Sequence, residues 1–304
     1  LASLIMVESR LVARSHQLEY DKPGDIPLTV YDSNDPDTRK VVADPAIVAK
    51  VWSAVKAGEK PPAPYVLGPD VPKLEAILND PERLMLGPRQ EEWLRLEIAK
   101  SVSLKQPWQI LGNQVVMART VAPNLYRALG KEKVEAIIAN LPAGPFRERV
   151  VAGIELFSYP IPFDPDGWDG YGAARERVYD AFKASNGNVV VMSGDSHAFW
   201  VNDLHDAGGT RVAAEFGVSS VTSPSVGDFM PNLDLGKIMV DQNKEIVFCD
   251  QNRKGYTLVT ITPEHVTGQL IAVDQLKKPY ERGVLATYRV TPADGPGVGE
   301  IVKV

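Results

Sequence analysis

A short apolar run in the second half of the chain constrains its fold more than any other feature. Residues 188–192 read NVVVM; an Asn-Gly turn signal precedes them, and the polar pair Ser193-Gly194 follows. A β-branched run of strand length between turn signals is typical of a central strand that is buried on both faces. Amphipathic helical patterns over 90–101 and 173–185 alternate with such strands. The sequence therefore predicts an α/β or α+β fold in packed layers.

Other segments extend this alternation, and strand patterns dominate after about residue 240. We predict further strands over 3–7, 108–117 (interrupted by Gly112) and 212–220, and further helices over 45–57 and 131–140. The strands at 3–7, 108–117 and 189–192 are apolar on both faces, so each is expected to be covered and paired. Residues 20–44 are expected to form a polar loop, and 60–72 a Pro-rich connector. We interpret 1–304 as part of one domain, with an insertion at about 120–165 and a meander of hairpins over about 240–304.

Composition excludes several classes of protein. A net charge of -6 argues against a general nucleic-acid or acidic-membrane binder. Cys249 is the only cysteine, which excludes an internal disulfide, a thiolate zinc cluster and a CxxC redox pair; Cys249 itself is interpreted as a core residue. With only four histidines, any metal site must depend on carboxylates and amides. No apolar run approaches the ~18 residues that a membrane-spanning helix needs.

The strongest local signal for chemistry is the segment Ser193-Gly194-Asp195-Ser196-His197, which directly follows the buried strand. Ligands of open α/β sheets bind at the carboxyl ends of strands. In extended backbone an Asp-x-His spacing places both side chains on one face, where a carboxylate oxygen and an imidazole nitrogen can bind one cation. A turn with a hydrogen-bonded Asp195 and a structural His197 remains the alternative.

Two further readings stay open. Ser196 in the sequence GDS could be the nucleophile of a serine esterase, but the DxxH that such enzymes often carry late in the chain is absent, and the only histidines beyond the GDSH segment are His205 and His265. Glu215 lies within an apolar strand pattern, which predicts a buried carboxylate paired with an arginine or with a metal; we favour the salt bridge.

Six segments, in order along the chain, resemble the alkaline phosphatase D (PhoD) family of metallophosphoesterases. SLIMVESRLVAR resembles that family's apolar strand and Asp-Thr-Arg, with Glu8 and Ser9 in place of Asp and Thr. The other five segments are QEEWLRLEIAKSVSLKQPWQILGNQVVMA, DGWDGYGAARERV, VVVMSGDSHAFWVNDL, EFGVSSVTSPS and GYTLVTITPEHVTGQL.

This resemblance implies a metallophosphatase-type α-β-β-α sandwich that hydrolyses phosphate mono- or diesters by means of a metal-bound hydroxide. It implies iron and calcium ions, with Asp195 and His197 as metal ligands, and a secreted or periplasmic protein. The family's remaining ligands lie on motifs upstream of the segments matched here. We therefore expect this chain to be an incomplete domain, whose partner is the missing N-terminal segment of the same domain and whose substrate is a phosphate ester.

A second pair of candidates lies at the end of the strand that begins at residue 108. In broader metallophosphatases the corresponding strand ends in a metal-binding histidine; here Asn113 and Gln114 occupy that position. An amide oxygen can bind a hard cation or orient a water molecule, so both are candidate catalytic residues. They could equally hydrogen-bond nearby backbone. A non-catalytic binding or structural protein that has lost the metal ligands is a further alternative.

Overall fold

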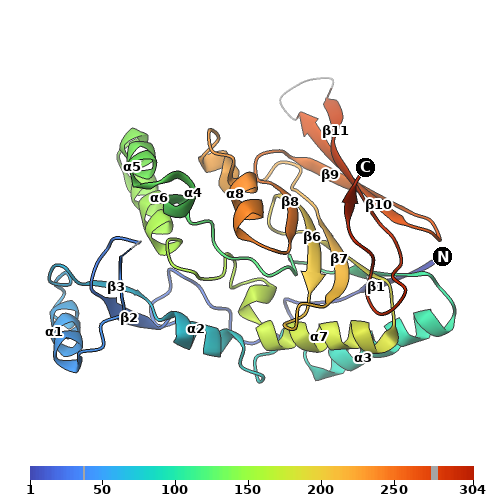
Figure 1. Ribbon diagram of the computed structural model, residues 1–304, viewed down its shortest axis with the longest axis horizontal. Coiled ribbons are helices and arrows are strands. Elements are labelled where there is room, and N and C mark those ends of the chain that lie inside the picture. Colours follow the sequence, from blue (N-terminus) through green and yellow to red (C-terminus); the bar gives the residue numbers. More distant parts are fainter. Residues whose placement is uncertain (37, 275–279) are drawn as a thin grey trace. The chain divides into compact units, whose positions relative to one another are not determined.

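The computed structural model describes residues 1–36, 38–274 and 280–304 (Figure 1). Position 37 of the expected loop and positions 275–279 of the expected β-rich end therefore lie outside the described residues. The chain forms two compact units. The large unit comprises Leu1–Gln17, Leu78–Val121 and Asp164–Val304, and the small unit comprises Leu18–Ile77 and Ala122–Phe163.

A six-stranded sheet of order β1-β4-β5-β7-β6-β8 forms the centre of the large unit. Its strands are β1 (Ala2–Met6), β4 (Trp108–Gly112), β5 (Val189–Ser193), β6 (Phe199–His205), β7 (Arg211–Gly217) and β8 (Ile246–Asp250). The first four in this spatial order run parallel to one another, and β6 is antiparallel to both of its neighbours. Nearly every residue of β4 and β5 is buried, which confirms the expectation for these two strands.

The expectation of burial on both faces is wrong for β1. Among the described residues only β4 pairs with it, and Leu4 and Met6 are 69% and 62% exposed, whereas Ile5 is buried. The strand predicted over 108–117 ends at Gly112, where the chain passes close to β1. A Cβ at Gly112 would lie 2.1 Å from the sulfur of Met6, so the exposed end of the Met6 side chain occupies the space beside this glycine.

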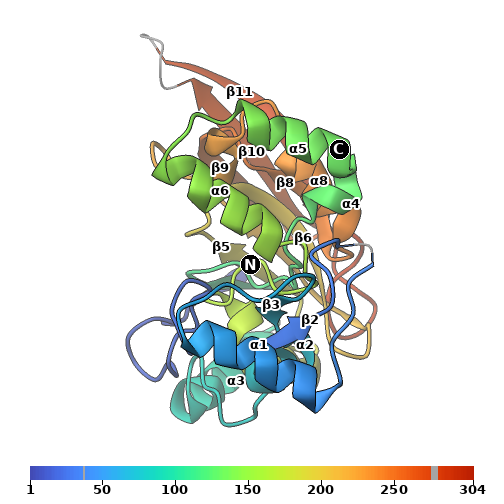
Figure 2. The same cartoon turned by 90° about the vertical axis from the view of Figure 1, so that its left-hand side faces the viewer.

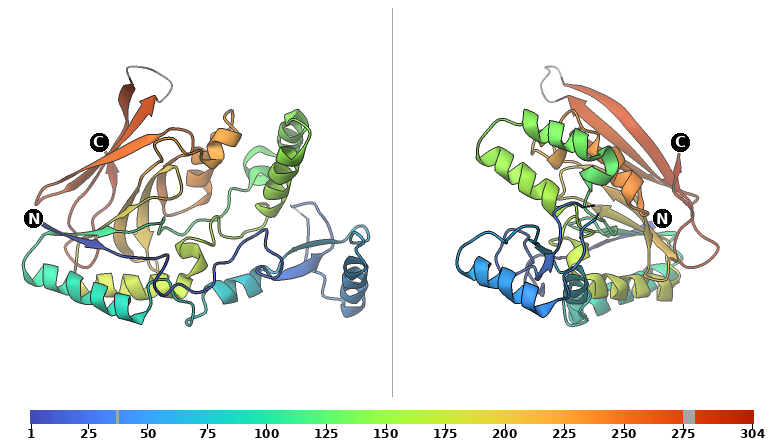
Figure 3. Two further views of the ribbon diagram at one scale, coloured as in Figure 1. Left: turned by 180° about the vertical axis from the view of Figure 1, so that it is seen from behind. Right: turned by 60° about the vertical axis from the view of Figure 1, so that its left-hand side comes forward.

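Two helices pack on one face of this sheet, α3 (Pro88–Ser103) and α7 (Gly172–Ser185) (Figures 1 and 3). Helix α3 begins with a proline, which its first turn tolerates, and has Glu91 early and Lys100 late, as the helix dipole favours. Helix α7 ends at Asn186, which adopts the left-handed conformation common at helix ends. Its fully buried Phe182 belongs to the core between helices and sheet.

A four-stranded antiparallel sheet packs on the opposite face. Its strands, in the order β12-β11-β10-β9, are β9 (Gly255–Ile261), β10 (Val266–Asp274), β11 (Glu281–Val290) and β12 (Val302–Lys303). Neighbours in sequence pair with one another, as the predicted meander requires, but the meander begins at β9, because β8 pairs with β6 in the six-stranded sheet. Side chains of both sheets, including Trp108, Phe216 and Leu270, form a second core. Helix α8 (Leu235–Gln242) packs beside β8. The large unit is thus layered helix, sheet, sheet.

Among its described residues the small unit contains a two-stranded sheet and five helices, which Figure 2 labels. These elements are β2 (Leu28–Tyr31), α1 (Pro45–Lys56), β3 (Val66–Pro69), α2 (Val71–Leu78), α4 (Leu125–Leu129), α5 (Lys131–Asn140) and α6 (Pro145–Leu156). The expected loop at 20–44 contains β2, and the expected connector at 60–72 contains β3, so both expectations were too simple. Each strand exists because the other pairs with it, a long-range contact that a local pattern does not reveal.

Candidate active site

The carboxyl ends of three neighbouring parallel strands meet at one edge of the six-stranded sheet. Met6 of β1 pairs with Gly112 of β4, which pairs with Met192 of β5. The segments that follow these strands are 7–10, 113–114 and 194–197, so the sheet brings together the loops that carry the predicted site residues. This edge is where an α/β sheet binds its ligands.

Asp195 and His197 both have left-handed backbone, with φ of 68° and 58°, so the extended backbone assumed for the Asp-x-His spacing is wrong. This conformation is uncommon outside glycine and is found repeatedly at functional sites, where the surrounding structure maintains it. The Asp195 side chain is 56% exposed, and its carboxylate forms an ion pair with the Nη2 atom of Arg10. The carboxylate is therefore accessible from solvent and sits beside a fixed positive charge.

Hydrogen bonding assigns the proton on the imidazole of His197. Its Nδ1 atom lies 2.8 Å from the carbonyl oxygen of Pro224. A carbonyl oxygen only accepts, so Nδ1 carries the proton in this contact. The neutral ring then has its lone pair on Nε2, which is the form that binds a metal ion or accepts a proton. The main-chain oxygen of His197 accepts a second bond from Ser219 Oγ at 3.0 Å.

Arg10 connects Asp195 to a second carboxylate. Its Nη1 atom lies 2.5 Å from Asp166 Oδ2, and Arg14 pairs with the other oxygen of Asp166. Burial alone would raise the pKa of Asp166, but the hydrogen bonds from Arg14 and Arg10 hold it below its ordinary value. Arg14 is fixed in turn by Tyr171, whose hydroxyl accepts from Nε at 2.9 Å. The guanidinium groups of Arg10 and Arg14 are thus both ordered beside the candidate site. The sequence predicted no role for Arg10 or for Asp166.

The amides of Asn113 and Gln114 make hydrogen bonds within the protein. Asn113 is buried; its Nδ2 donates to the carbonyl of Val115, and its Oδ1 accepts from the indole of Trp168 at 3.2 Å. Gln114 Oε1 accepts from both the main-chain nitrogen and the hydroxyl of Ser9, each at 2.6 Å. These bonds tie the end of β4 to the segments beside it. Roles for the two amides as ligands or water-orienting groups stay predictions.

Glu8 caps its own loop. Its carboxylate accepts from the main-chain nitrogens of Arg10, Leu11 and Val12 at 2.7, 2.8 and 3.0 Å. Burial alone would raise the pKa of Glu8, but the hydrogen bonds from Leu11 and Arg10 lower it overall. The carboxylate therefore shapes the segment that holds Arg10.

The favoured salt bridge of Glu215 is not what the structure shows. Glu215 is fully buried, and its carboxylate accepts from the main-chain nitrogens of Met117 and Ala118 at 2.7 and 3.1 Å and from Asn202 Nδ2 at 2.7 Å. Burial raises the pKa of this carboxyl group above its ordinary value. Its role is to hold the segment after β4 against β7 and β6.

Ser196 does not show the geometry of an activated nucleophile. Its hydroxyl accepts a hydrogen bond of 2.7 Å from the indole of Trp200. A serine nucleophile is instead expected to hydrogen-bond a histidine that is oriented by an acid. His205, one of the two later histidines, directs Nδ1 to the main-chain oxygen of Asp203 at 2.8 Å. These contacts do not support the serine-esterase alternative.

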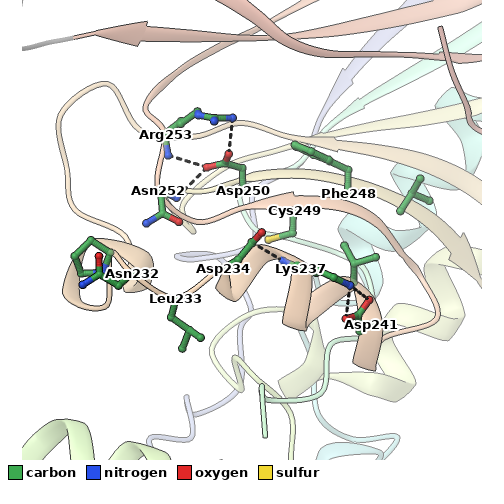
Figure 4. A pocket seen from close by; sticks show the side chains of 13 residues that line it. Asn232, Leu233, Asp234, Lys237, Asp241, Phe248, Cys249, Asp250, Asn252 and Arg253 are labelled. Carbon is green, nitrogen blue, oxygen red and sulfur yellow. Dashed lines mark hydrogen bonds and ion pairs between the residues drawn. The ribbon is translucent and has the colours of Figure 1, made fainter. Parts of the chain in front are cut away.

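A pocket of about 620 Å³ lies between α8 and β8 (Figure 4). Its charged side chains bond one another: Lys237 pairs with Asp241 at 2.7 Å, and Asp250 pairs with Arg253 at 3.3 Å. Cys249 lines this pocket but is buried, and burial raises the pKa of its thiol, so it is an inert core residue as predicted. Because its charges are already paired, we assign no role to this pocket.

The donor set at Asp195 and His197 fits a cation in its chemistry. It offers an exposed carboxylate and an imidazole whose other nitrogen is bonded to a main-chain carbonyl, the arrangement found around metal-binding histidines. Within residues 1–36, 38–274 and 280–304, no group of three or more histidine, cysteine, aspartate or glutamate side chains is arranged to hold a metal ion.

Over the same ranges, no helix is both long and apolar enough to cross a membrane.

Comparisons with known proteins agree with this geometry. The family model described as PhoD-like phosphatase matches residues 1–270. Alkaline phosphatase D of Bacillus subtilis (strain 168) is 30% identical over 191 residues, which are 61% of this chain and 26% of that protein. A solved structure described as "Structure of PhoD" aligns with all of this chain and 42% of its own, at a TM-score of 0.59 and 20% identity, which shows a shared fold. The chain thus spans less than half the length of these relatives. It belongs to the PhoD-like phosphatase family and has that family's metallophosphatase-type fold.

Proposed function

We propose that this chain forms part of a metal-dependent site that hydrolyses phosphate mono- or diesters. The observation that carries the proposal is that one loop at the carboxyl end of β5 holds both an exposed Asp195 carboxylate and a His197 ring whose Nδ1 is bonded to a main-chain carbonyl. Family membership supports the same reaction class. The serine-esterase alternative receives no comparable support.

Asp195 and His197 would hold the cation in this proposal. When bound, such an ion supplies positive charge for the phosphoryl oxygens and lowers the pKa of a water molecule. Carboxylate-rich ligation suits hard cations, in keeping with the iron and calcium implied by the resemblance. A hard cation takes roughly six or more donors, and two come from these side chains. We therefore propose that further ligands come from polypeptide outside residues 1–304.

Arg10 would orient both the carboxylate and the substrate. Its ion pairs to Asp166 and Asp195 fix the guanidinium at the edge of the site. A guanidinium has five N–H donors in a planar fork that matches phosphate oxygens. We propose that Arg10 directs its N–H groups to an anionic phosphoryl oxygen when Asp195 engages a cation, while Asp166 keeps Arg10 in place.

Substitution of the two proposed ligands tests the function. In the complete protein, Asp195→Ala and His197→Ala should each reduce bound metal, measured by inductively coupled plasma mass spectrometry. Each should also reduce hydrolysis of p-nitrophenyl phosphate and bis-p-nitrophenyl phosphate, by at least the roughly 10–100-fold typical of changes around metal ligands. His265→Ala, outside this loop, is the matched control. Unchanged metal content in both variants would contradict the proposed site.

Two further measurements separate the alternatives. Ser196→Ala should retain phosphatase activity, whereas a serine esterase would lose its turnover. A wild-type protein that carries no metal and gains no activity from added iron or calcium would support a non-catalytic binding or structural role. We also propose a secreted or periplasmic location, as the resemblance implies, which cell fractionation would test.

A further inference from the structure

The loop that contacts the ring of His197 lies between β7 and α8. It includes the 3-10 helix η2 (Val226–Phe229), and its Pro224 supplies the carbonyl bonded to His197 Nδ1. This loop packs against the turn at residues 251–254, which joins β8 to β9. Main-chain and side-chain contacts connect the two: Gly255 N donates to Ser220 O at 2.9 Å, and Asn252 Nδ2 donates to Gly227 O at 3.2 Å.

The loop and the turn approach too closely for an ordinary side chain at one point. A Cβ on Gly227 would lie 2.3 Å from the main-chain oxygen of Gln251. The same oxygen accepts a hydrogen bond from the hydroxyl of Ser225. The position of Pro224, which directly precedes Ser225, therefore depends on how the loop is fixed to the turn.

Lys254 supplies a buried charge at this junction. Its side chain is only 5% exposed, and its Nζ lies 2.7 Å from Asp228 Oδ2 and 2.9 Å from Ser225 Oγ. Asp228 Oδ2 in turn accepts from Ser225 N at 2.6 Å, and it lies 3.0 Å from Ser225 Oγ. An ammonium group removed from water is costly unless it is paired, so these contacts fix Ser225 and Asp228 relative to Lys254.

A serine hydrogen-bonded to a lysine can be a nucleophile–base pair, but the surroundings of Ser225 argue against that role. Its side chain is buried, and its hydroxyl already contacts Lys254, Asp228 and Gln251. A substrate cannot approach an oxygen enclosed in this way without opening the loop. The contacts of Ser225 are instead those of a structural junction.

We propose that Lys254 is a positioning residue for His197. By holding Ser225 and Asp228, it sets the direction of the adjacent Pro224 carbonyl, which keeps the proton of His197 on Nδ1 and presents Nε2 as a neutral nitrogen donor. This inference rests on the proposed function in that Nε2 is the atom offered to the metal. The chain of contacts from Lys254 to His197 Nδ1 itself requires no metal.

Nuclear magnetic resonance of ¹⁵N-histidine-labelled protein tests the proposal directly. Long-range ¹H–¹⁵N correlations distinguish the two neutral tautomers, and residues 1–304 contain only four histidines, so His197→Gln identifies the signal. The wild-type metal-free protein should show His197 protonated on Nδ1. Lys254→Met should shift the ring toward the Nε2-protonated form or an exchanging mixture and weaken Fe²⁺ affinity, measured by titration calorimetry, about 10–100-fold, because iron accepts imidazole nitrogen as a ligand. Lys254→Arg, which retains the positive charge, should restore both.

Two further variants, one control and one second change at the same junction, help to interpret the effect of Lys254→Met on the His197 tautomer. Lys237→Met removes a lysine that pairs with Asp241 on α8 and should leave the His197 signal unchanged. Asp228→Asn removes the negative charge opposite Lys254 at a side chain that is 37% exposed but keeps an amide oxygen that can accept from Nζ, so it gives an independent perturbation of the same junction and should also disturb the tautomer.

An unchanged Nδ1-protonated ring in both folded Lys254→Met and folded Asp228→Asn would overturn the proposal, as would an Nε2-protonated ring in the wild type. If the tautomer shifts as expected but the wild-type protein binds neither Ca²⁺ nor iron, the positioning role stands and the proposed function fails.

Discussion

Replacing Glu215 with leucine should destabilise the large unit by about 3 kcal/mol or more. The carboxylate is fully buried in β7 and is the acceptor for three donors, the main-chain nitrogens of Met117 and Ala118 and the amide of Asn202. All three of these residues are themselves buried. Leucine offers no acceptor, so the substitution leaves these donors without this partner.

Each buried donor left unsatisfied costs about 1–3 kcal/mol, which gives a gross loss of about 3–9 kcal/mol. Two effects offset part of this loss of stability. Leucine adds apolar surface worth about 1.5–3 kcal/mol when buried. The substitution also removes the desolvation cost of the buried carboxyl group, the same cost that raises the pKa of Glu215. A net loss of about 3 kcal/mol is a large fraction of the 5–15 kcal/mol that stabilises a typical protein.

Urea unfolding followed by tryptophan fluorescence measures this loss as a difference in the free energy of unfolding. Glu215→Gln retains one acceptor oxygen and should cost less than Glu215→Leu. The matched control is Glu92→Gln, on the exposed face of α3, where loss of its solvent-screened pair with Arg95 should leave the free energy of unfolding nearly unchanged. A Glu215→Leu protein as stable as the control would refute the reasoning, since the three bonds would then carry no net stability.

Two other predictions concern the network and the loop of the candidate site. The two arginines lower the pKa of Asp166, so its contribution to stability is present above its ordinary pKa of 3.8 and is lost as the pH falls through the lowered value. The stability difference between wild type and Asp166→Asn should therefore close as the pH falls below that ordinary pKa, as pH-dependent unfolding would show. An equal difference at every pH would contradict this sign. Gly227→Ala places a Cβ against the main-chain oxygen of Gln251, so it should lower the thermal midpoint of unfolding, and an unchanged midpoint would show that the loop yields without cost.

The sequence by itself determined the elements whose burial follows a local period. The apolar run of β5, the helical repeats of α3 and α7 and the alternation of the β9–β11 meander each predicted the structure that forms, because one strand or helix displays its own burial pattern. The position of Asp195 and His197 at the end of β5 followed from the same reasoning.

Only the tertiary structure decided what those residues contact. Strands β2 and β3 form by pairing with each other across more than thirty residues of chain. Arg10 meets Asp166 and Asp195, which lie 156 and 185 positions away, and Glu215 takes its donors from the end of β4 and from β6. No local period encodes such contacts, because they depend on which strand ends the folded sheet places next to each other. The carbonyl that contacts His197 Nδ1 likewise lies 27 positions away in the sequence, on the loop whose Ser225 contacts Lys254.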